Sequence, residues 1–120
     1  VLLPQLIYSG NDNSERAKEL LSFLGLSERM YHFPSQLSGG ERSRVSIARA
    51  LINRPKIILA DEPSGNLDHV NAKKLVELFK SINKEFSQSI IITTHDSNVA
   101  SIGDRKLLLD NGILASVDNV

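Results

Sequence analysis

Two stretches of the sequence decide the fold: LSGGE at residues 37–41 and IILADE at residues 57–62. The first is a turn of small residues that opens a helix, and the second is an apolar run that ends in two adjacent carboxylates. A continuous apolar run of this length is typical of a strand that is covered on both faces in a parallel sheet. In this order, the two stretches predict an α/β fold and phosphate chemistry on a nucleotide.

The composition is that of an ordinary globular domain. Of the 120 residues, 41% are hydrophobic and 23% are charged, which provides enough apolar material for a core. The 14 basic residues balance the 14 acidic ones, so the charge gives no reason to expect a nucleic acid partner. There is no cysteine for disulfides or thiol chemistry, and no apolar stretch approaches the roughly 18 residues of a membrane span. Because the sequence opens on an apolar segment without an initiating Met, we expect a fragment of a longer protein.

The residues around the first stretch predict helices. Asp12 and Glu15 fit the start of a helix and Gly25 its end, with apolar residues at helical spacing between them: Ala17, Leu20, Leu21 and Leu24. We expect a short helical turn over 27–30 and a loop over 31–36. A second helix is expected over 41–52. Together these elements predict a helical subdomain over residues 1–55.

The residues after the second stretch predict alternating strands and helices over 56–120. A strand is expected over 56–60 and a parallel one over 89–94, joined by a crossover helix. The buried stripe of that helix is predicted to be Leu75, Phe79, Ile82 and Phe86. Lys73 and Glu77 lie one turn apart on its wet side. A brief helix over 97–102 and a hairpin that turns at 110–112 complete the pattern.

Ser38, Gly39 and Gly40 form a candidate anion site. Two glycines before a helix allow close backbone approach, and the helix start presents unpaired N–H groups at the positive end of its dipole. The Ser38 hydroxyl adds another donor. The alternative is an ordinary helix cap, in which Ser38 caps the helix and binds no ligand.

Asp61 and Glu62 stand where the predicted strand emerges from the sheet. Ligands of open α/β sheets bind at the carboxyl ends of strands, where one carboxylate could hold Mg²⁺ and the other accept a proton from water. The alternative is a solvated strand end without a catalytic role. His95 follows the next strand, which would place it near both carboxylates, although by itself it could equally be a structural histidine.

Three other residues have weaker claims. Asp68 could cap the helix that begins near His69, and this explanation is as good as any other from the residues alone. His32 and His69 have no placement of this kind, and we interpret both as structural.

The same residues, taken together, resemble the ATP-binding subunits of ABC transporters. The motifs that carry the resemblance are the signature at 37–41, with Glu41 at a position where Gln is also common, Walker B at 57–61, the catalytic glutamate at Glu62, the D-loop at 64–68 and the switch histidine at His95. Residues 60–68 are also similar to the lipoprotein-releasing, macrolide-export and cell-division-associated ATPases.

The resemblance implies a fold, an activity and partners. The fold would be part of a P-loop NTPase core of the RecA type, with parallel strands and crossover helices, preceded by a helical subdomain that carries the signature. The activity would be hydrolysis of ATP, which powers export or release of a substrate. The partners would be a second copy in a head-to-tail dimer and a transmembrane permease, with the subunit in the cytoplasm at the inner face of the cell membrane.

The resemblance also gives each motif a role. The residues that would bind the partner subunit's ATP are Ser38, Gly39, Gly40 and Glu41. Within the subunit, Asp61 would hold Mg²⁺ through water, Glu62 would polarise the attacking water, His95 would contact the γ-phosphate and Asp68 would couple the two sites.

One motif of the family does not occur in these 120 residues. The Walker A pattern, Gly-x-x-x-x-Gly-Lys-Ser/Thr, is absent because no glycine is followed by lysine. We therefore expect the isolated chain to be inactive. Two alternatives stay open: an ABC-type ATPase of DNA repair or translation, and a noncatalytic interaction domain.

Overall fold

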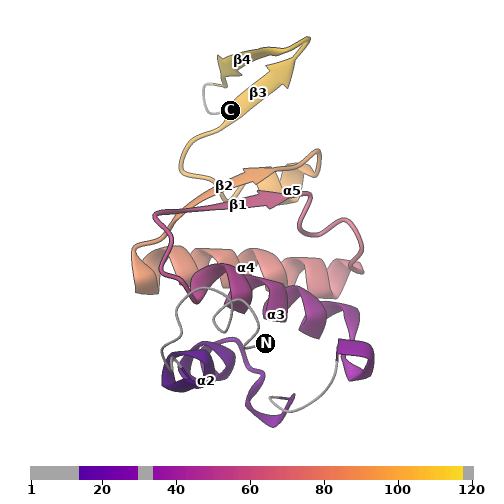
Figure 1. The fold of residues 1–120 in the computed structure, drawn as a ribbon. Coiled ribbons are helices and arrows are strands. Elements are labelled where there is room, and N and C mark those ends of the chain that lie inside the picture. The colour runs from indigo at the N-terminus through magenta and orange to yellow at the C-terminus, as the bar shows by residue number, and fades with distance from the viewer. Residues whose placement is uncertain (1–13, 30–33, 118–120) are drawn as a thin grey trace.

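The computed structural model describes residues 14–29 and 34–117 (Figure 1). In chain order the elements are α2 (Ser14–Phe23), η1 (Ser27–Arg29), η2 (Pro34–Gln36), α3 (Gly39–Leu51), β1 (Ile57–Asp61), α4 (His69–Phe86), β2 (Ser89–Thr93), α5 (Ser97–Ala100), β3 (Leu107–Asp110) and β4 (Ile113–Ser116). The expected roles of Asp12 and His32 lie outside the described residues. None of the described helices is both long enough and apolar enough to cross a membrane.

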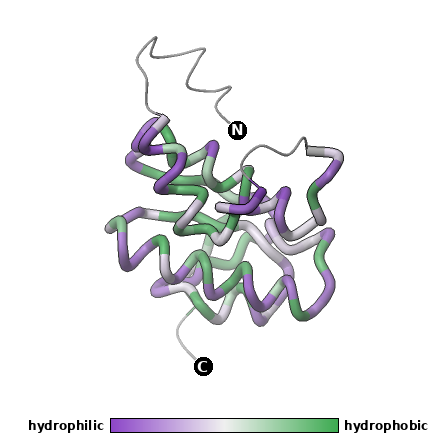
Figure 2. The backbone as a smooth tube through the Cα atoms, turned by 90° about the horizontal axis from the view of Figure 1, so that it is seen from below, coloured by the Kyte–Doolittle hydropathy of each residue, from purple (hydrophilic) through white to green (hydrophobic). Residues whose placement is uncertain are grey.

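The elements stack in layers, with the β1–β2 sheet above α3 and α4, and α2 below them (Figure 1). The two strands are parallel, with Ile58 opposite Ile90 and Asp61 opposite Thr93, and α4 is the crossover between them. This confirms the predicted α/β class and parallel pair. Along the helices, hydrophilic and hydrophobic residues alternate, as a half-buried helix requires (Figure 2).

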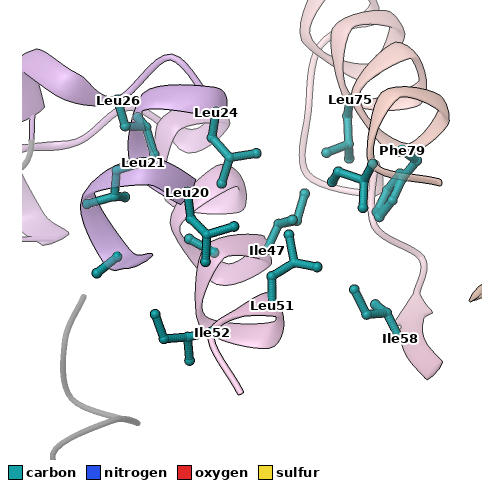
Figure 3. Packing of buried hydrophobic residues seen from close by; sticks show 13 residues of the cluster. Leu20, Leu21, Leu24, Leu26, Ile47, Leu51, Ile52, Ile58, Leu75 and Phe79 are labelled. Atoms are coloured by element: carbon teal, nitrogen blue, oxygen red, sulfur yellow. The ribbon is translucent and has the colours of Figure 1, made fainter. Parts of the chain in front are cut away.

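The core lies between the helices and the lower face of the sheet. Side chains of α2, α3, α4 and β1 meet there (Figure 3), and the most deeply buried are Leu26, Leu51 and Ile82. The Arg16 guanidinium, on α2, donates to the carbonyls of Leu51 and Ile52 at 2.7 and 3.0 Å, which satisfies the end of α3. The packed helices therefore support the ends of β1 and β2.

The sheet differs from the prediction that its first strand is covered on both faces. Ile58 is buried, but Ile57 is 52% and Leu59 is 76% exposed, and Ile91 of β2 is 54% exposed. Helices cover only one face of β1 and β2 (Figure 1). The expectation of two-sided burial is thus wrong for the described chain, because a continuous apolar run does not reveal what lies against its second face.

The crossover helix confirms most of its predicted stripe. Leu75, Phe79 and Ile82 are buried, whereas Phe86 is 40% exposed and packs edge-on against Phe23, with ring centroids 5.0 Å apart. Glu77 pairs with Lys80 at 3.6 Å rather than with Lys73. Only the last residue of the predicted stripe, Phe86, thus lies at the edge of the core.

Other boundaries shift slightly. Residues 34–36 form a 3₁₀ turn within the expected loop, and α3 begins at Gly39, earlier than expected, because Ser38 is its cap. The brief helix is α5 alone, shorter than the predicted 97–102. The hairpin forms as predicted, with Asn111 and Gly112 at φ 48° and 78°, the left-handed conformation that this dipeptide tolerates.

Candidate functional site

The turn before α3 is a capping box. Ser38 is extended, at φ −67° and ψ 166°, and its Oγ accepts the Glu41 N–H at 3.1 Å, while Glu41 Oε1 accepts the Ser38 N–H at 3.0 Å. Ser followed three residues later by Glu is the sequence pattern of this box. Ser38 therefore does cap α3, as the alternative interpretation states. The cap still leaves the first amides of α3 without partners inside the helix.

Glu41 also has a partner from another element. The Nε of Arg29 lies 3.1 Å from Glu41 Oε2. The hydrogen bonds from Ser38 are the main cause that lowers the pKa of Glu41, and the nearby Arg29 charge adds to it. Glu41 is thus a charged carboxylate in the first turn of α3 at neutral pH.

The two glycines of the turn face the start of α4. A Cβ at Gly40 would lie 3.3 Å from Asn71 Oδ1, and one at Gly39 would lie 3.9 Å from a methyl of Leu67. A side chain at position 40 would therefore press on the Asn71 side chain of α4. The structure therefore places the 37–41 stretch against the D-loop segment and the first turn of α4.

Asp61 and Glu62 stand at the carboxyl end of β1, with different neighbours. Asp61 is directly opposite Thr93, whose hydroxyl donates to Asp61 Oδ1 at 2.6 Å. Glu62 continues the sheet through its N–H, which donates to the Thr93 carbonyl at 2.8 Å, and then turns the chain at φ 44°. Gly65 N–H closes this turn on the Glu62 carbonyl at 3.0 Å.

The Glu62 carboxylate is held by the segment that follows β2. The His95 N–H donates to Glu62 Oε1 at 3.1 Å, and Nδ1 of the same histidine lies 2.5 Å from that oxygen. The Thr94 hydroxyl points at Oε2 from 3.5 Å. The side chains of His95 and Glu62 are 92% and 36% exposed, so both remain open to a ligand. Parallel neighbouring strands thus bring His95 to Glu62, as the sequence predicts.

Asp68 caps α4. Its carboxylate accepts the Asn71 N–H at 2.8 Å and the Asn71 side-chain amide at 3.0 Å, and these bonds lower the pKa of Asp68. His69, the first residue of α4, is exposed. The sequence gives no signal for Asn71, although this residue bonds to the Asp68 cap and also lies closest to Gly40.

The Asp68 cap predicts a pH dependence of stability. A carboxyl whose pKa is lowered on folding stabilises the fold above its ordinary value of 3.8, and this contribution is lost as the pH falls through the folded value. In Asp68→Asn, the side-chain oxygen still caps but does not titrate. We expect urea unfolding to show the wild type losing stability relative to Asp68→Asn between about pH 6 and about pH 3. An equal difference at both pH values would contradict this.

The capped turn and the carboxylates lie on the same side of the molecule. In Figure 1 the right-hand side of the molecule holds the starts of α3 and α4 and the carboxyl ends of β1 and β2. Within the described ranges, no hydrogen bond or ion pair joins 38–41 to Asp61, Glu62 or His95. The two groups are therefore separate, one able to receive an anion and the other able to orient water and a cation.

Two contacts of the site are not evident from the sequence. The Thr93 hydroxyl on Asp61 depends on the exact strand register, which a one-residue slip would remove. The Arg29 contact with Glu41 joins elements that local patterns do not relate. Residue type gives the first a weak signal, because a hydroxyl in an otherwise apolar strand end invites a polar partner.

Comparison with known proteins identifies the family. Residues 1–65 match the family model described as ABC transporter. The chain is 49% identical over 116 residues to the lipoprotein-releasing system ATP-binding protein LolD of Cytophaga hutchinsonii, covering 95% of this chain and 53% of that protein. It is 46% identical over 120 residues to the macrolide export ATP-binding/permease protein MacB of Rhodopirellula baltica, covering 96% and 17%.

Solved structures agree with the sequence comparison. The dimeric structure of MJ0796, a bacterial ABC transporter cassette, is 40% identical with a TM-score of 0.74, over 99% of this chain and 55% of that one. A post-hydrolysis state of the same cassette, bound to ADP and Pi, is 39% identical with a TM-score of 0.74, over 99% and 55%. The chain spans about half the length of the LolD proteins it matches. It belongs to the ABC transporter family.

Proposed function

We propose that this chain is part of an ATP-hydrolysing subunit that powers export or release of a substrate through a membrane permease. The observation that carries the proposal is the contact of Glu62 with His95 beside Asp61, at the edge of a parallel sheet. A carboxylate and an imidazole in this position suit the activation of water, and the remainder of phosphoryl transfer is positioning and charge stabilisation.

The capped turn suits a nucleotide phosphate. The amides of Gly39 and Gly40 stand at the positive end of the α3 dipole, and Ser38 Oγ is held there by the capping box. Among the described residues, 38–41 forms no hydrogen bond or ion pair with Asp61, Glu62 or His95, and we assign it to the γ-phosphate of ATP held by a second copy. The dimeric structure of the MJ0796 cassette supports a dimer, and we propose that its two copies are arranged head to tail.

Asp61 suits a magnesium ion that retains its water. Its Oδ1 accepts the Thr93 hydroxyl, and its Oδ2 has no hydrogen-bond partner among the described residues. Mg²⁺ takes one or two carboxylates and completes its shell with water and phosphate, so a single carboxylate at a strand end suits it. When bound, Mg²⁺ would neutralise the charge of the phosphates.

Glu62 and His95 divide the remaining work. Glu62 would accept hydrogen bonds from the attacking water and take up its proton, while His95 would donate to the γ-phosphate. In this structure both groups of His95, its N–H and its ring, engage a single oxygen of Glu62. Asp68, at the start of α4 and beside the signature turn, would couple the two sites of a dimer.

The relatives support a subgroup for the proposed subunit. Relatives include lipoprotein-releasing and macrolide export proteins, at 46–49% identity for the two described above. We place the subunit with them, at the inner face of the cell membrane and bound to a transmembrane permease.

Nucleotide binding and turnover test the proposed function. The full-length subunit is expected to release phosphate from Mg-ATP, whereas the 120-residue chain alone is expected to bind it poorly, because a glycine-rich loop normally cradles the phosphates. Calorimetric titration of the chain and a phosphate-release assay of the full-length subunit measure both. Micromolar binding by the isolated chain would contradict the expectation for the chain, and a full-length subunit without turnover would contradict the function.

A further inference from the structure

Arg29 has a contact that the proposed mechanism does not use. It is the last residue of η1, and its Nε reaches Glu41 Oε2 in the first turn of α3 at 3.1 Å. The Arg29 side chain is 48% and the Glu41 side chain 24% exposed. An ion pair this exposed contributes little to folding in most proteins, so its place beside the signature turn invites another explanation.

The contact completes a chain of bonds that ends at Ser38. One oxygen of Glu41 accepts from Arg29 and the other accepts the Ser38 N–H, while the Glu41 N–H donates to Ser38 Oγ. The Ser38 N–H therefore depends on the orientation of the Glu41 side chain, whereas Ser38 Oγ bonds to the Glu41 backbone N–H. Arg29 fixes that orientation from a separate element.

Charge gives the same contact a second consequence. A carboxylate in the first turn of α3 would repel a phosphate that approaches the amides of the same turn. A guanidinium next to the carboxylate offsets this repulsion. The closer the two opposite charges lie, the weaker the remaining repulsion of the phosphate becomes. With Gln at position 41, there would be no charge to offset.

We propose that Arg29 is a positioning residue for the nucleotide: it holds and neutralises Glu41, so that Ser38 and the start of α3 can accept the γ-phosphate. This role rests on the proposed function. A rival explanation is that Arg29 only ties η1 to α3. A mere tie would lower thermal stability and leave the ATP dependence of dimer formation unchanged, whereas positioning shifts the ATP dependence, and only while residue 41 is charged.

The test is a double-mutant cycle in the full-length subunit, in a Glu62→Gln background that stops hydrolysis. Analytical ultracentrifugation measures the ATP concentration at half-maximal dimer formation. We expect Arg29→Gln to raise this midpoint about threefold to tenfold and Arg29→Lys to raise it less. In a Glu41→Gln background, Arg29→Gln should change it less than about twofold.

Lys80→Gln is the matched control, because it removes one positive charge from another exposed ion pair, with Glu77, far from the turn in sequence. Its midpoint should equal that of the parent. Thermal unfolding of every variant shows whether the fold is retained. If Arg29→Gln does not fold, Arg29→Lys carries the test, because the positioning role requires a shift of the same sign.

An unchanged midpoint in the Arg29 variants would overturn the proposal. An equal shift with Glu41 and with Gln at position 41 would also overturn it, because the proposed positioning acts through the charge of Glu41. A Glu62→Gln parent that fails to dimerise with ATP would instead contradict the proposed function, and the role of Arg29 with it.

Discussion

Glu62→Gln in the full-length subunit is expected to slow ATP hydrolysis by roughly 10²–10⁴-fold, about 3–5 kcal/mol in the barrier. Gln keeps the shape of Glu62 and can still accept the His95 N–H, but its amide cannot take a proton from water. ATP binding should be spared, because the residues that receive the phosphates are elsewhere. Single-turnover phosphate release and nucleotide titration separate the two effects.

Glu77→Gln is the control for this prediction. It makes the same chemical change on an exposed carboxylate of α4, whose partner is Lys80. Its turnover should stay within about twofold of the wild type, because surface substitutions of this kind rarely change stability or activity. Near-normal turnover of Glu62→Gln would contradict the role assigned to Glu62.

Ile82→Ala is expected to lower the free energy of unfolding by about 2–5 kcal/mol. Ile82 is fully buried, on the face of α4 that packs into the core with Phe79 and Leu75. Removing its side chain loses apolar burial and leaves a cavity that the surrounding helices fill only in part. Urea unfolding followed by circular dichroism measures the loss.

Val70→Ala is the matched control on the same helix. Val70 is 62% exposed, so its truncation should change the free energy of unfolding by no more than about 0.5 kcal/mol. A loss below about 1 kcal/mol for Ile82→Ala would show that α4 does not hold the core together in solution.

Local patterns predict much of the fold. The helical spacing of Leu75, Phe79 and Ile82 and the Asn111-Gly112 turn depend on neighbouring residues, and the structure contains both as expected. The exposure of Leu59 could not be predicted in this way, because an apolar run says that a strand is suited to burial and not which face is covered.

The contacts of the candidate site also fall into those that the sequence predicts and those that it does not. The approach of His95 to Glu62 follows from two parallel strands that end side by side. The contact of Thr93 with Asp61 requires the exact register, and the left-handed conformation of Glu62 is rare for a non-glycine residue and has no pattern in the sequence. The Arg29 contact depends on how η1 folds back, which no local rule predicts.

A structure of the full-length Glu62→Gln subunit with Mg-ATP tests most directly whether two subunits share each ATP site. We expect a dimer in which each γ-phosphate contacts position 62 and His95 of one subunit. The same phosphate should contact the partner subunit's Ser38 and glycine amides, at hydrogen-bond distances of about 3 Å. Ser38 and position 62 of the same subunit on one phosphate, or a bound nucleotide that no Ser38 turn contacts, would contradict it.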